Sequence, residues 1–180
     1  MSYCEFTKDL DDNHPHRLYH DNHYGFPIEN DNELFGRLIL EINQAGLNWL
    51  TILKKEQNLK KAFNNFEISE VAKFKNPEIN LLMQDSGIIR NRLKIEAAIY
   101  NANKIIELQK EYGSFRSWLD FNLGKDLKEW TFLFKKNFKF TGGLIVEEFL
   151  MSTGYIKGAH DENCEIYKEI LKLEPKWKID

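Results

Sequence analysis

The sequence has little that would crosslink a small protein covalently or anchor it in a membrane. Only two cysteines occur among its 180 residues, so no more than one disulfide can form. No apolar run reaches the ~18 residues of a membrane-spanning helix. Residues 1–30 contain Asp, His and Asn where a signal peptide would have its apolar core. We therefore expect a cytoplasmic protein without membrane contact, in which thiols favour a metal over a disulfide.

A strong excess of one charge is also missing. The formal net charge is −3, so no overall field draws the protein to nucleic acid or to anionic membranes. A nucleic-acid partner would need a local basic surface instead. Apolar residues make up 42% and aromatic residues 13% of the chain, which is enough for the core of a single domain.

Helical periodicity dominates the chain from Asn32 onward, and few segments alternate with a period of two. Residues 1–30 are predicted to be irregular, because Pro15, Gly25 and Pro27 interrupt them. The spacing of apolar residues therefore predicts an all-α fold. The predicted helices span residues 32–45, 49–63, 69–74, 77–85, 90–112, 115–121, 128–137 and 144–153.

The two cysteines lie at opposite ends of the chain, each close to histidines. Cys4 and His20 are near the start, and His160 and Cys164 have an H-x-x-x-C spacing near the end. Two thiolates and two imidazoles are the ligands of a closed, structural zinc site. Spacing leaves open which N-terminal histidine is the ligand, and a chance gathering of these residues is the alternative. All five histidines lie in the two terminal segments: His14, His16, His20, His23 and His160.

Gly87 lies in a turn between two predicted helices. The first amide N–H groups of the second helix, with Arg90, Arg92 and Lys94 close by, can bind a phosphate. The pattern resembles a helix-hairpin-helix element, which contacts the DNA backbone without reading the base sequence. An ordinary helical hairpin with a glycine C-cap is the alternative.

Glu41 is an acidic residue in a predicted helix that is otherwise strongly apolar. A carboxylate that faces an apolar cavity is costly without a partner, which makes Glu41 a candidate for binding or catalysis. A solvent-facing glutamate is the alternative. Flat aromatic rings can stack on a base and attract a cationic one, but they form a site only if they share a pocket with Glu41. The candidate rings are Tyr19, Tyr24, Phe26 and Trp49.

Several blocks of the sequence, in order, resemble the DNA-3-methyladenine glycosylase I family. Together they cover nearly the whole chain, and several blocks at consistent spacing are more specific than any one alone. The blocks are residues 19–22, 24–25 with Pro27, 44–49, 53–55, 84–90, Arg92 with 94–95, and 138–140 with Gly142, followed by His160 and Cys164.

The resemblance implies a single glycosylase domain over residues 1–180, of the helix-hairpin-helix superfamily. Its two helical lobes would share one base pocket, with the helix-hairpin-helix at about 78–105. Zinc would join the terminal segments 1–30 and 155–180. The zinc ligands that the resemblance implies are Cys4, His20, His160 and Cys164.

The resemblance also implies a DNA repair enzyme that hydrolyses the N-glycosidic bond of 3-methyladenine in alkylated double-stranded DNA. It would act as a monomer and leave an abasic site, without lyase activity. Glu41 would be the catalytic residue, and Tyr19, Tyr24 and Trp49 would bind the flipped base. The implied phosphate contacts are Gly87, Ile89, Arg90, Arg92 and Lys94.

The chain departs from the family pattern at three positions near the expected site. Tyr24 stands where tryptophan is usual, and Glu147 and Glu148 stand where an aromatic and a small polar residue are usual. Two carboxylates that point into the pocket would favour an alternative: a DNA-binding member of the fold with altered base specificity or no catalysis. A zinc-stapled helical protein that binds no DNA is a third reading.

Overall fold

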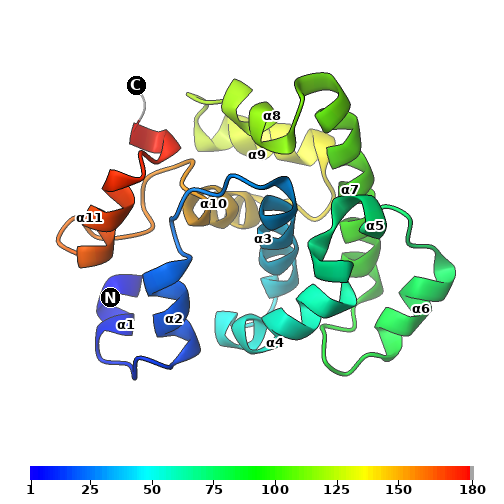
Figure 1. Cartoon of the computed structure of the whole chain (residues 1–180), viewed down its shortest axis with the longest axis horizontal. Helices are drawn as coiled ribbons and strands as arrows, with labels where there is room; N and C mark the ends of the chain where they lie inside the picture. The colour runs from blue at the N-terminus through cyan, green and yellow to red at the C-terminus, as the bar shows by residue number, and fades with distance from the viewer. Residues whose placement is uncertain (179–180) are drawn as a thin grey trace.

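A computed structural model describes residues 1–178, and every regular element there is a helix (Figure 1). The all-α prediction is confirmed for this part of the chain. The last two residues of the predicted terminal segment, 179–180, lie outside it. The helices are α1 (Tyr3–Lys8), α2 (Pro15–Asn22), α3 (Asp31–Gln44), α4 (Trp49–Ala62), η1 (Asn64–Phe66), α5 (Ile68–Val71), α6 (Asn76–Gln84), α7 (Arg92–Tyr112), α8 (Phe115–Phe121), α9 (Leu127–Asn137), α10 (Gly143–Ser152), α11 (Glu165–Lys172) and η2 (Lys176–Lys178).

The prediction that residues 1–30 are irregular is wrong, because α1 and α2 lie there. Ser2 begins α1 with a capping box, in which the Ser2 and Glu5 side chains bond each other's backbone N–H groups. Pro15 is the first residue of α2 rather than its breaker, since a missing N–H costs nothing at that position. Helix α11 was not predicted either, although it buries Ile170 against the body of the protein.

Helix α3 runs through the centre of the molecule and is held at both ends. At its start, the Asp31 carboxylate accepts hydrogen bonds from the backbone N–H groups of Phe115 (2.8 Å) and Arg116 (3.0 Å), the first residues of α8. At its end, the buried Lys94 ammonium of α7 donates to the carbonyl oxygens of Asn43 (2.9 Å) and Ala45 (2.6 Å). These contacts anchor both ends of the helix that carries Glu41.

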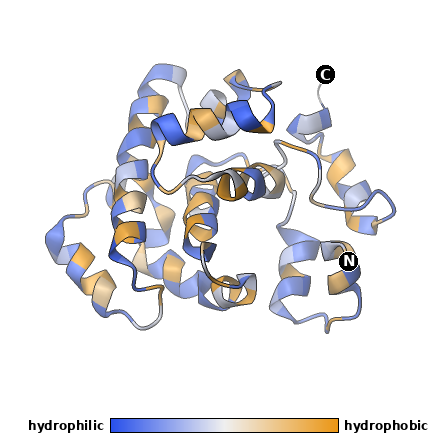
Figure 2. Ribbon diagram, turned by 180° about the vertical axis from the view of Figure 1, so that it is seen from behind, coloured by the Kyte–Doolittle hydropathy of each residue, from blue (hydrophilic) through white to orange (hydrophobic). Residues whose placement is uncertain are grey.

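The core surrounds α3 and the central helix α10. Figure 2 shows apolar residues concentrated on these two helices, with hydrophilic residues more frequent on the outer ones. Burial of such apolar surface is the main favourable contribution to folding. The largest fully buried side chains include Phe35, Leu38, Ile42, Phe115, Trp130, Phe134 and Phe149. No helix among residues 1–178 is both long enough and apolar enough to cross a membrane.

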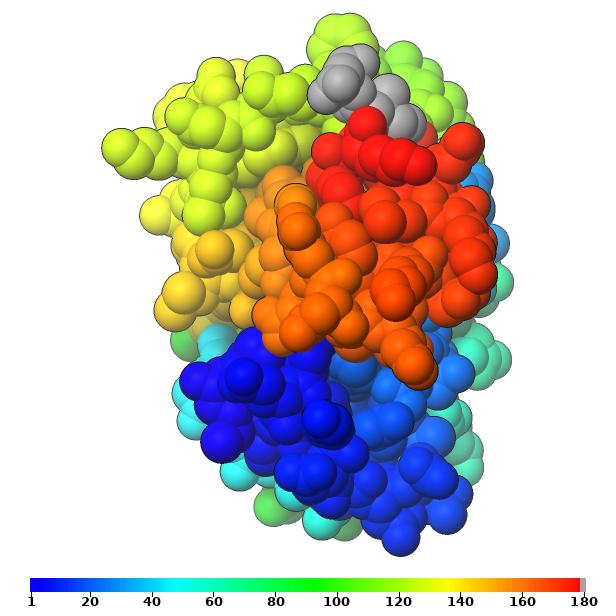
Figure 3. Space-filling view, turned by 90° about the vertical axis from the view of Figure 1, so that its left-hand side faces the viewer, coloured from blue at the N-terminus to red at the C-terminus, as the bar shows by residue number. Residues whose placement is uncertain are grey.

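The two ends of the chain lie against each other on one side of the molecule. Figure 3 shows the first residues, in dark blue, directly beside the orange residues that follow α10. The Ser2 hydroxyl donates a hydrogen bond to the Asp161 carboxylate across this contact. Gly25 has a φ of +81°, and a Cβ there would lie 2.7 Å from the Cβ of Ala159, so this close approach requires glycine.

Candidate active site and metal centre

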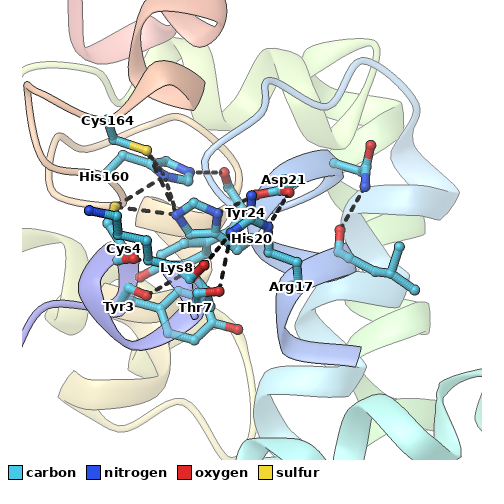
Figure 4. A network of polar contacts seen from close by, with 12 residues as sticks. Tyr3, Cys4, Thr7, Lys8, Arg17, His20, Asp21, Tyr24, His160 and Cys164 are labelled. Atoms are coloured by element: carbon cyan, nitrogen blue, oxygen red, sulfur yellow. Dashed lines mark hydrogen bonds and ion pairs between the residues drawn. The ribbon is translucent and has the colours of Figure 1, made fainter. Parts of the chain in front are cut away.

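Four side chains from the two ends of the chain converge on one point (Figure 4). The Nε2 of His20 lies 3.1 Å from the Nδ1 of His160, and the Cys4 sulfur lies 3.3 Å and 3.5 Å from these two atoms. The Cys164 sulfur is 3.9 Å from both nitrogens. In a tetrahedral site with Zn–N near 2.0 Å and Zn–S near 2.3 Å, ligand atoms are about 3.3–3.8 Å apart. The group can therefore hold a tetrahedrally coordinated metal ion.

The other ring nitrogen of each histidine has a partner that orients the imidazole. Nδ1 of His20 lies 2.6 Å from the Asp21 carboxylate, and Nε2 of His160 lies 2.7 Å from the carbonyl oxygen of Tyr24. An N–H on each of these nitrogens leaves the facing nitrogen with a lone pair for a metal. Carboxylates and carbonyls commonly fulfil this role behind metal-binding histidines. Arg17 donates to the same Asp21 carboxylate at 2.6 Å and holds it in place.

Beside this centre is a cavity of about 220 Å³. It brings together the predicted carboxylate, Glu41, and three of the predicted aromatic residues. The sequence did not identify Tyr3, His16 and Gln44 as cavity residues. The first two lie in a segment that was predicted to be irregular. The residues that line the cavity are Tyr3, His16, Tyr19, Tyr24, Glu41, Gln44, Trp49 and Glu148.

Glu41 is only 3% exposed, which excludes the solvent-facing alternative. Burial raises the pKa of its carboxyl group to about 8, because an ionised carboxylate loses most of its hydration there. The Arg37 guanidinium, one helical turn earlier, partly offsets this rise, whereas the negative charge of Glu148 adds to it. With a pKa of about 8, the carboxyl group of Glu41 is mostly protonated at neutral pH.

Aromatic rings form the walls around Glu41. The Tyr19 ring meets Trp49 edge to face at 5.1 Å between centroids, and lies 5.6 Å from Tyr24. The Arg37 guanidinium donates to the Tyr19 hydroxyl at 3.1 Å and to the Ser152 carbonyl at 3.2 Å. Burial raises the pKa of both tyrosines, so their hydroxyls stay protonated and can donate hydrogen bonds.

The metal centre and the cavity share backbone segments. Tyr19 and His20 are neighbours on α2. Tyr19 lines the cavity, and His20 belongs to the four-ligand group. The Tyr24 ring lines the cavity while its carbonyl oxygen accepts the hydrogen bond from His160 (Figure 4). The four-ligand group and two of the aromatic walls are therefore linked through adjacent residues.

The turn between α6 and α7 is fixed to α4. The Lys55 ammonium donates to the carbonyl oxygens of Ser86 (3.0 Å) and Gly87 (3.1 Å). The amide of Gly87, a predicted phosphate contact, already donates to the Asp85 carboxylate at 2.7 Å. Arg90, three residues after Gly87, is exposed.

The remaining predicted phosphate contacts divide into accessible and buried groups. Arg92, half-exposed at the start of α7, donates to the Asn80 side chain at 3.0 Å, and Ile89 is partly buried. Lys94 is 5% exposed, and both of its acceptors are carbonyls at the C-terminal end of α3. The prediction that Lys94 contacts phosphate is therefore corrected: its ammonium satisfies carbonyls that the helix end leaves unpaired.

Comparison with known proteins identifies similar sequences. The model of the methyladenine glycosylase family matches residues 10–131. The DNA-3-methyladenine glycosylase 1 of Escherichia coli (strain K12) is 32% identical over 168 residues, which cover 83% of this chain and 89% of that protein. The DNA-3-methyladenine glycosylase of Haemophilus influenzae is 40% identical over 92 residues, about half of each chain.

Solved structures with the same fold include two glycosylases. The 3-methyladenine DNA glycosylase I of Staphylococcus aureus superposes with a TM-score of 0.82 at 29% identity, over 92% of this chain and 97% of that one. A tyrosine-to-phenylalanine variant of 3-methyladenine DNA glycosylase I, in complex with 3-methyladenine, gives 0.81 at 30% identity over the same shares. The family match includes Glu41 and ends before α10, which carries Glu148.

Proposed function

Since this chain belongs to the methyladenine glycosylase family and is a DNA-3-methyladenine glycosylase, we propose that it removes 3-methyladenine from alkylated double-stranded DNA. The damaged nucleotide would leave the base stack and enter the cavity beside Glu41, since the glycosidic bond is out of reach inside a duplex. The observation that carries this proposal is a buried carboxyl group in a cavity walled by aromatic rings.

Such a cavity suits a cationic base. A purine that is methylated at N3 and bonded to deoxyribose through N9 carries a positive charge, which aromatic faces and a carboxylate both attract. A cation beside Glu41 lowers the pKa of its carboxyl group, so that the residue ionises and accepts a hydrogen bond from the base edge. Neutral adenine would leave the buried carboxylate uncompensated, and the pocket therefore discriminates against it.

The reaction needs little activation of the leaving group. As the C1′–N9 bond breaks, its electron pair stays on N9, and the base leaves as neutral 3-methyladenine. Water adds to the resulting sugar cation at C1′ and loses a proton, which leaves an abasic site. Because no amine nucleophile takes part, we propose a monofunctional hydrolase without lyase activity.

We also propose that the metal ion is zinc and that its role is structural. Four protein ligands of the types Cys and His fill a tetrahedral shell and leave no open position for a substrate. When bound, zinc would supply coordination energy that holds α1 and α2 against the segment after α10. The aromatic walls formed by Tyr19 and Tyr24 depend on this attachment.

The turn between α6 and α7 is our proposed contact with the DNA backbone, in the manner of a helix-hairpin-helix. Arg90 is exposed there, and the first backbone N–H groups of α7 can bind a phosphate, although the Asn91 side chain already accepts from the backbone N–H of Lys94. With a net charge of −3, such a local basic surface is what binding requires. A monomer would suffice, since one chain supplies the cavity and the turn.

The direct test is release of 3-methyladenine from methylated duplex DNA, followed by chromatography of the free base. Glu41→Gln is expected to slow release about ten- to a hundred-fold, since a charged hydrogen bond to the base is lost. Glu33→Gln is the matched control, because Glu33 lies exposed on the same helix. Absence of release by the zinc-loaded wild-type protein would refute the proposed function.

A second candidate is a DNA-binding protein of this fold without catalysis. This reading is based on two carboxylates that point into the cavity. Of Glu147 and Glu148, only Glu148 lines it, so the support for the reading is halved. Binding to a duplex that contains an abasic analogue separates the two. An enzyme binds this mimic of its product more tightly than undamaged DNA, whereas equal affinity for both duplexes supports the non-catalytic protein.

A further inference from the structure

Two carboxyl groups face the same cavity from different helices. Glu41 comes from α3 and Glu148 from α10, and both line the space of about 220 Å³. The resemblance to the glycosylase family accounts for Glu41, whereas a small polar residue is usual at the position of Glu148. The Tyr24 hydroxyl donates to Oε2 of Glu148 at 3.2 Å. This bond holds the Glu148 side chain at the cavity.

The charge of Glu148 acts on Glu41 across the cavity. Burial raises the pKa of Glu148, the Tyr24 hydrogen bond opposes this rise, and the neighbouring charge of Glu147 adds to it. The charge of Glu148 in turn raises the pKa of Glu41, which Arg37 partly offsets. Like charges in a site of low polarity do not both ionise readily, so an empty cavity favours bound protons.

The other side chains that line the cavity carry no permanent positive charge. Burial lowers the pKa of His16, so that its imidazole stays neutral near pH 7. Burial raises the pKa of Tyr3, and its hydroxyl stays protonated. The permanent charge of Arg37, whose guanidinium donates to the Tyr19 hydroxyl and the Ser152 carbonyl, only partly offsets the pKa rise of Glu41. A ligand that lets both carboxyl groups ionise must therefore bring the positive charge itself.

We propose that Glu148 is a second specificity-determining carboxylate, which together with Glu41 restricts the cavity to alkylated bases that carry a positive charge. This inference rests on the proposed function and extends it from one base to a chemical class, the cationic N-alkylated purines. The positive charge of such a base balances both carboxylates. A neutral base balances neither carboxylate. When it binds, the two carboxyl groups either stay protonated or remain as unpaired negative charges.

The same charge distinguishes substrate from product. In the substrate the N9 atom is bonded to the sugar, and the methylated ring is a cation. After cleavage the electron pair of the C1′–N9 bond remains on N9, so the free base is neutral and its attraction to Glu148 is lost. Glu148 therefore strengthens binding of the damaged nucleotide without strengthening retention of the released base.

The test compares two small ligands of nearly the same shape. At about pH 8 the 3,9-dimethyladeninium ion carries a positive charge, because both ring alkyl groups stay in place, whereas 3-methyladenine is neutral. Calorimetry gives a dissociation constant for each ligand. Glu148→Gln removes the charge and keeps an oxygen that accepts from Tyr24, and Glu147→Gln makes the same change one residue away, outside the cavity.

We expect Glu148→Gln to reduce the preference for the cation over the neutral base about tenfold or more, as loss of a nearby opposite charge predicts. Glu147→Gln should change this ratio less than about twofold, because its charge lies outside the cavity. A ratio unchanged in Glu148→Gln, or changed equally in both variants, would overturn the inference. Melting temperature and zinc content verify folding, and Glu148→Ser serves if the glutamine variant does not fold.

The outcome is separable from that of the proposed function. A wild-type protein that releases no 3-methyladenine from DNA refutes the function. A wild-type protein that releases it, with an unchanged ligand preference in the Glu148 variants, refutes only the role of Glu148.

Discussion

Replacing Glu41 with glutamine should stabilise the folded protein, and more so at higher pH. The carboxyl group has a pKa of about 8 in the native state, against 4.5 when it is fully hydrated. Between these values the native state retains a proton that the unfolded chain has lost. The free energy of unfolding of the wild type therefore falls as pH rises through this window, and the full penalty is present above about pH 8.

The magnitude follows from the interval between the two pKa values. At about 1.4 kcal/mol for each pH unit, the interval from 4.5 to about 8 corresponds to roughly 4–5 kcal/mol. Glutamine has the same shape and carries no charge, so Glu41→Gln avoids this cost. For a domain of this size, 1 kcal/mol shifts the melting temperature by about 2–4 °C. The variant should therefore melt roughly 10 °C higher than the wild type near pH 8.5.

The assay is thermal unfolding of the zinc-loaded, DNA-free protein from about pH 6 to about pH 8.5, followed by circular dichroism. Excess zinc keeps the metal centre filled at every pH. Effects of pH that are common to all variants cancel in the difference between the melting temperatures of variant and wild type. Glu33→Gln, on the exposed part of α3, should follow the wild type throughout. A difference between Glu41→Gln and wild type that stays constant with pH would refute the reasoning, because Glu41 would then ionise at little cost in the native state.

Three further changes test the metal centre, the support of α3 and the DNA contact. Removing zinc with a chelator should lower the melting temperature and abolish base release, since metal-binding energy contributes directly to folding; unchanged melting in a protein shown to be metal-free would contradict the structural role. Lys94→Met should cost about 1–3 kcal/mol of stability, measured by urea unfolding, because two carbonyls at the end of α3 lose their donor. The DNA affinity of this variant should depend on salt as that of the wild type does. A shallower salt dependence would show that Lys94 does contact a phosphate. Arg90→Ala should weaken binding to any duplex and lower the slope of log affinity against log salt by about 1, as loss of one phosphate contact predicts; an unchanged slope would place the DNA elsewhere.

Periodicity in the sequence predicts the helices of the body well, because apolar residues at three- and four-residue spacing mark the buried faces of α3, α4 and α10. It fails in the first 30 residues, where Pro15 suggests a break but in fact opens α2. The capping box of Ser2 and Glu5 is a local signal that could have identified α1, and with it Tyr3 as a cavity residue.

The sequence alone predicts site residues only where chemistry marks them. Glu41 is conspicuous because an acid interrupts an apolar helix face. The function of Lys94 is not visible in this way, since its acceptors lie 49 and 51 positions away in sequence and meet it only after folding. Similarly, spacing does not choose His20 among the N-terminal histidines. Its orientation depends on Asp21 beside it and on the approach of His160 from the other end of the chain.

The location of the metal ligands at both ends of the chain has a consequence for biosynthesis. His160 and Cys164 follow Cys4 and His20 by 140 residues or more, so a ribosome makes the two halves of the group at widely separated times. While residues 21–159 are being synthesised, the nascent polypeptide carries only Cys4 and His20 of the four. A chain that stops before His160 contains Glu41 and its helix but lacks the segment that packs against the N-terminal residues. We therefore expect such fragments to be inactive.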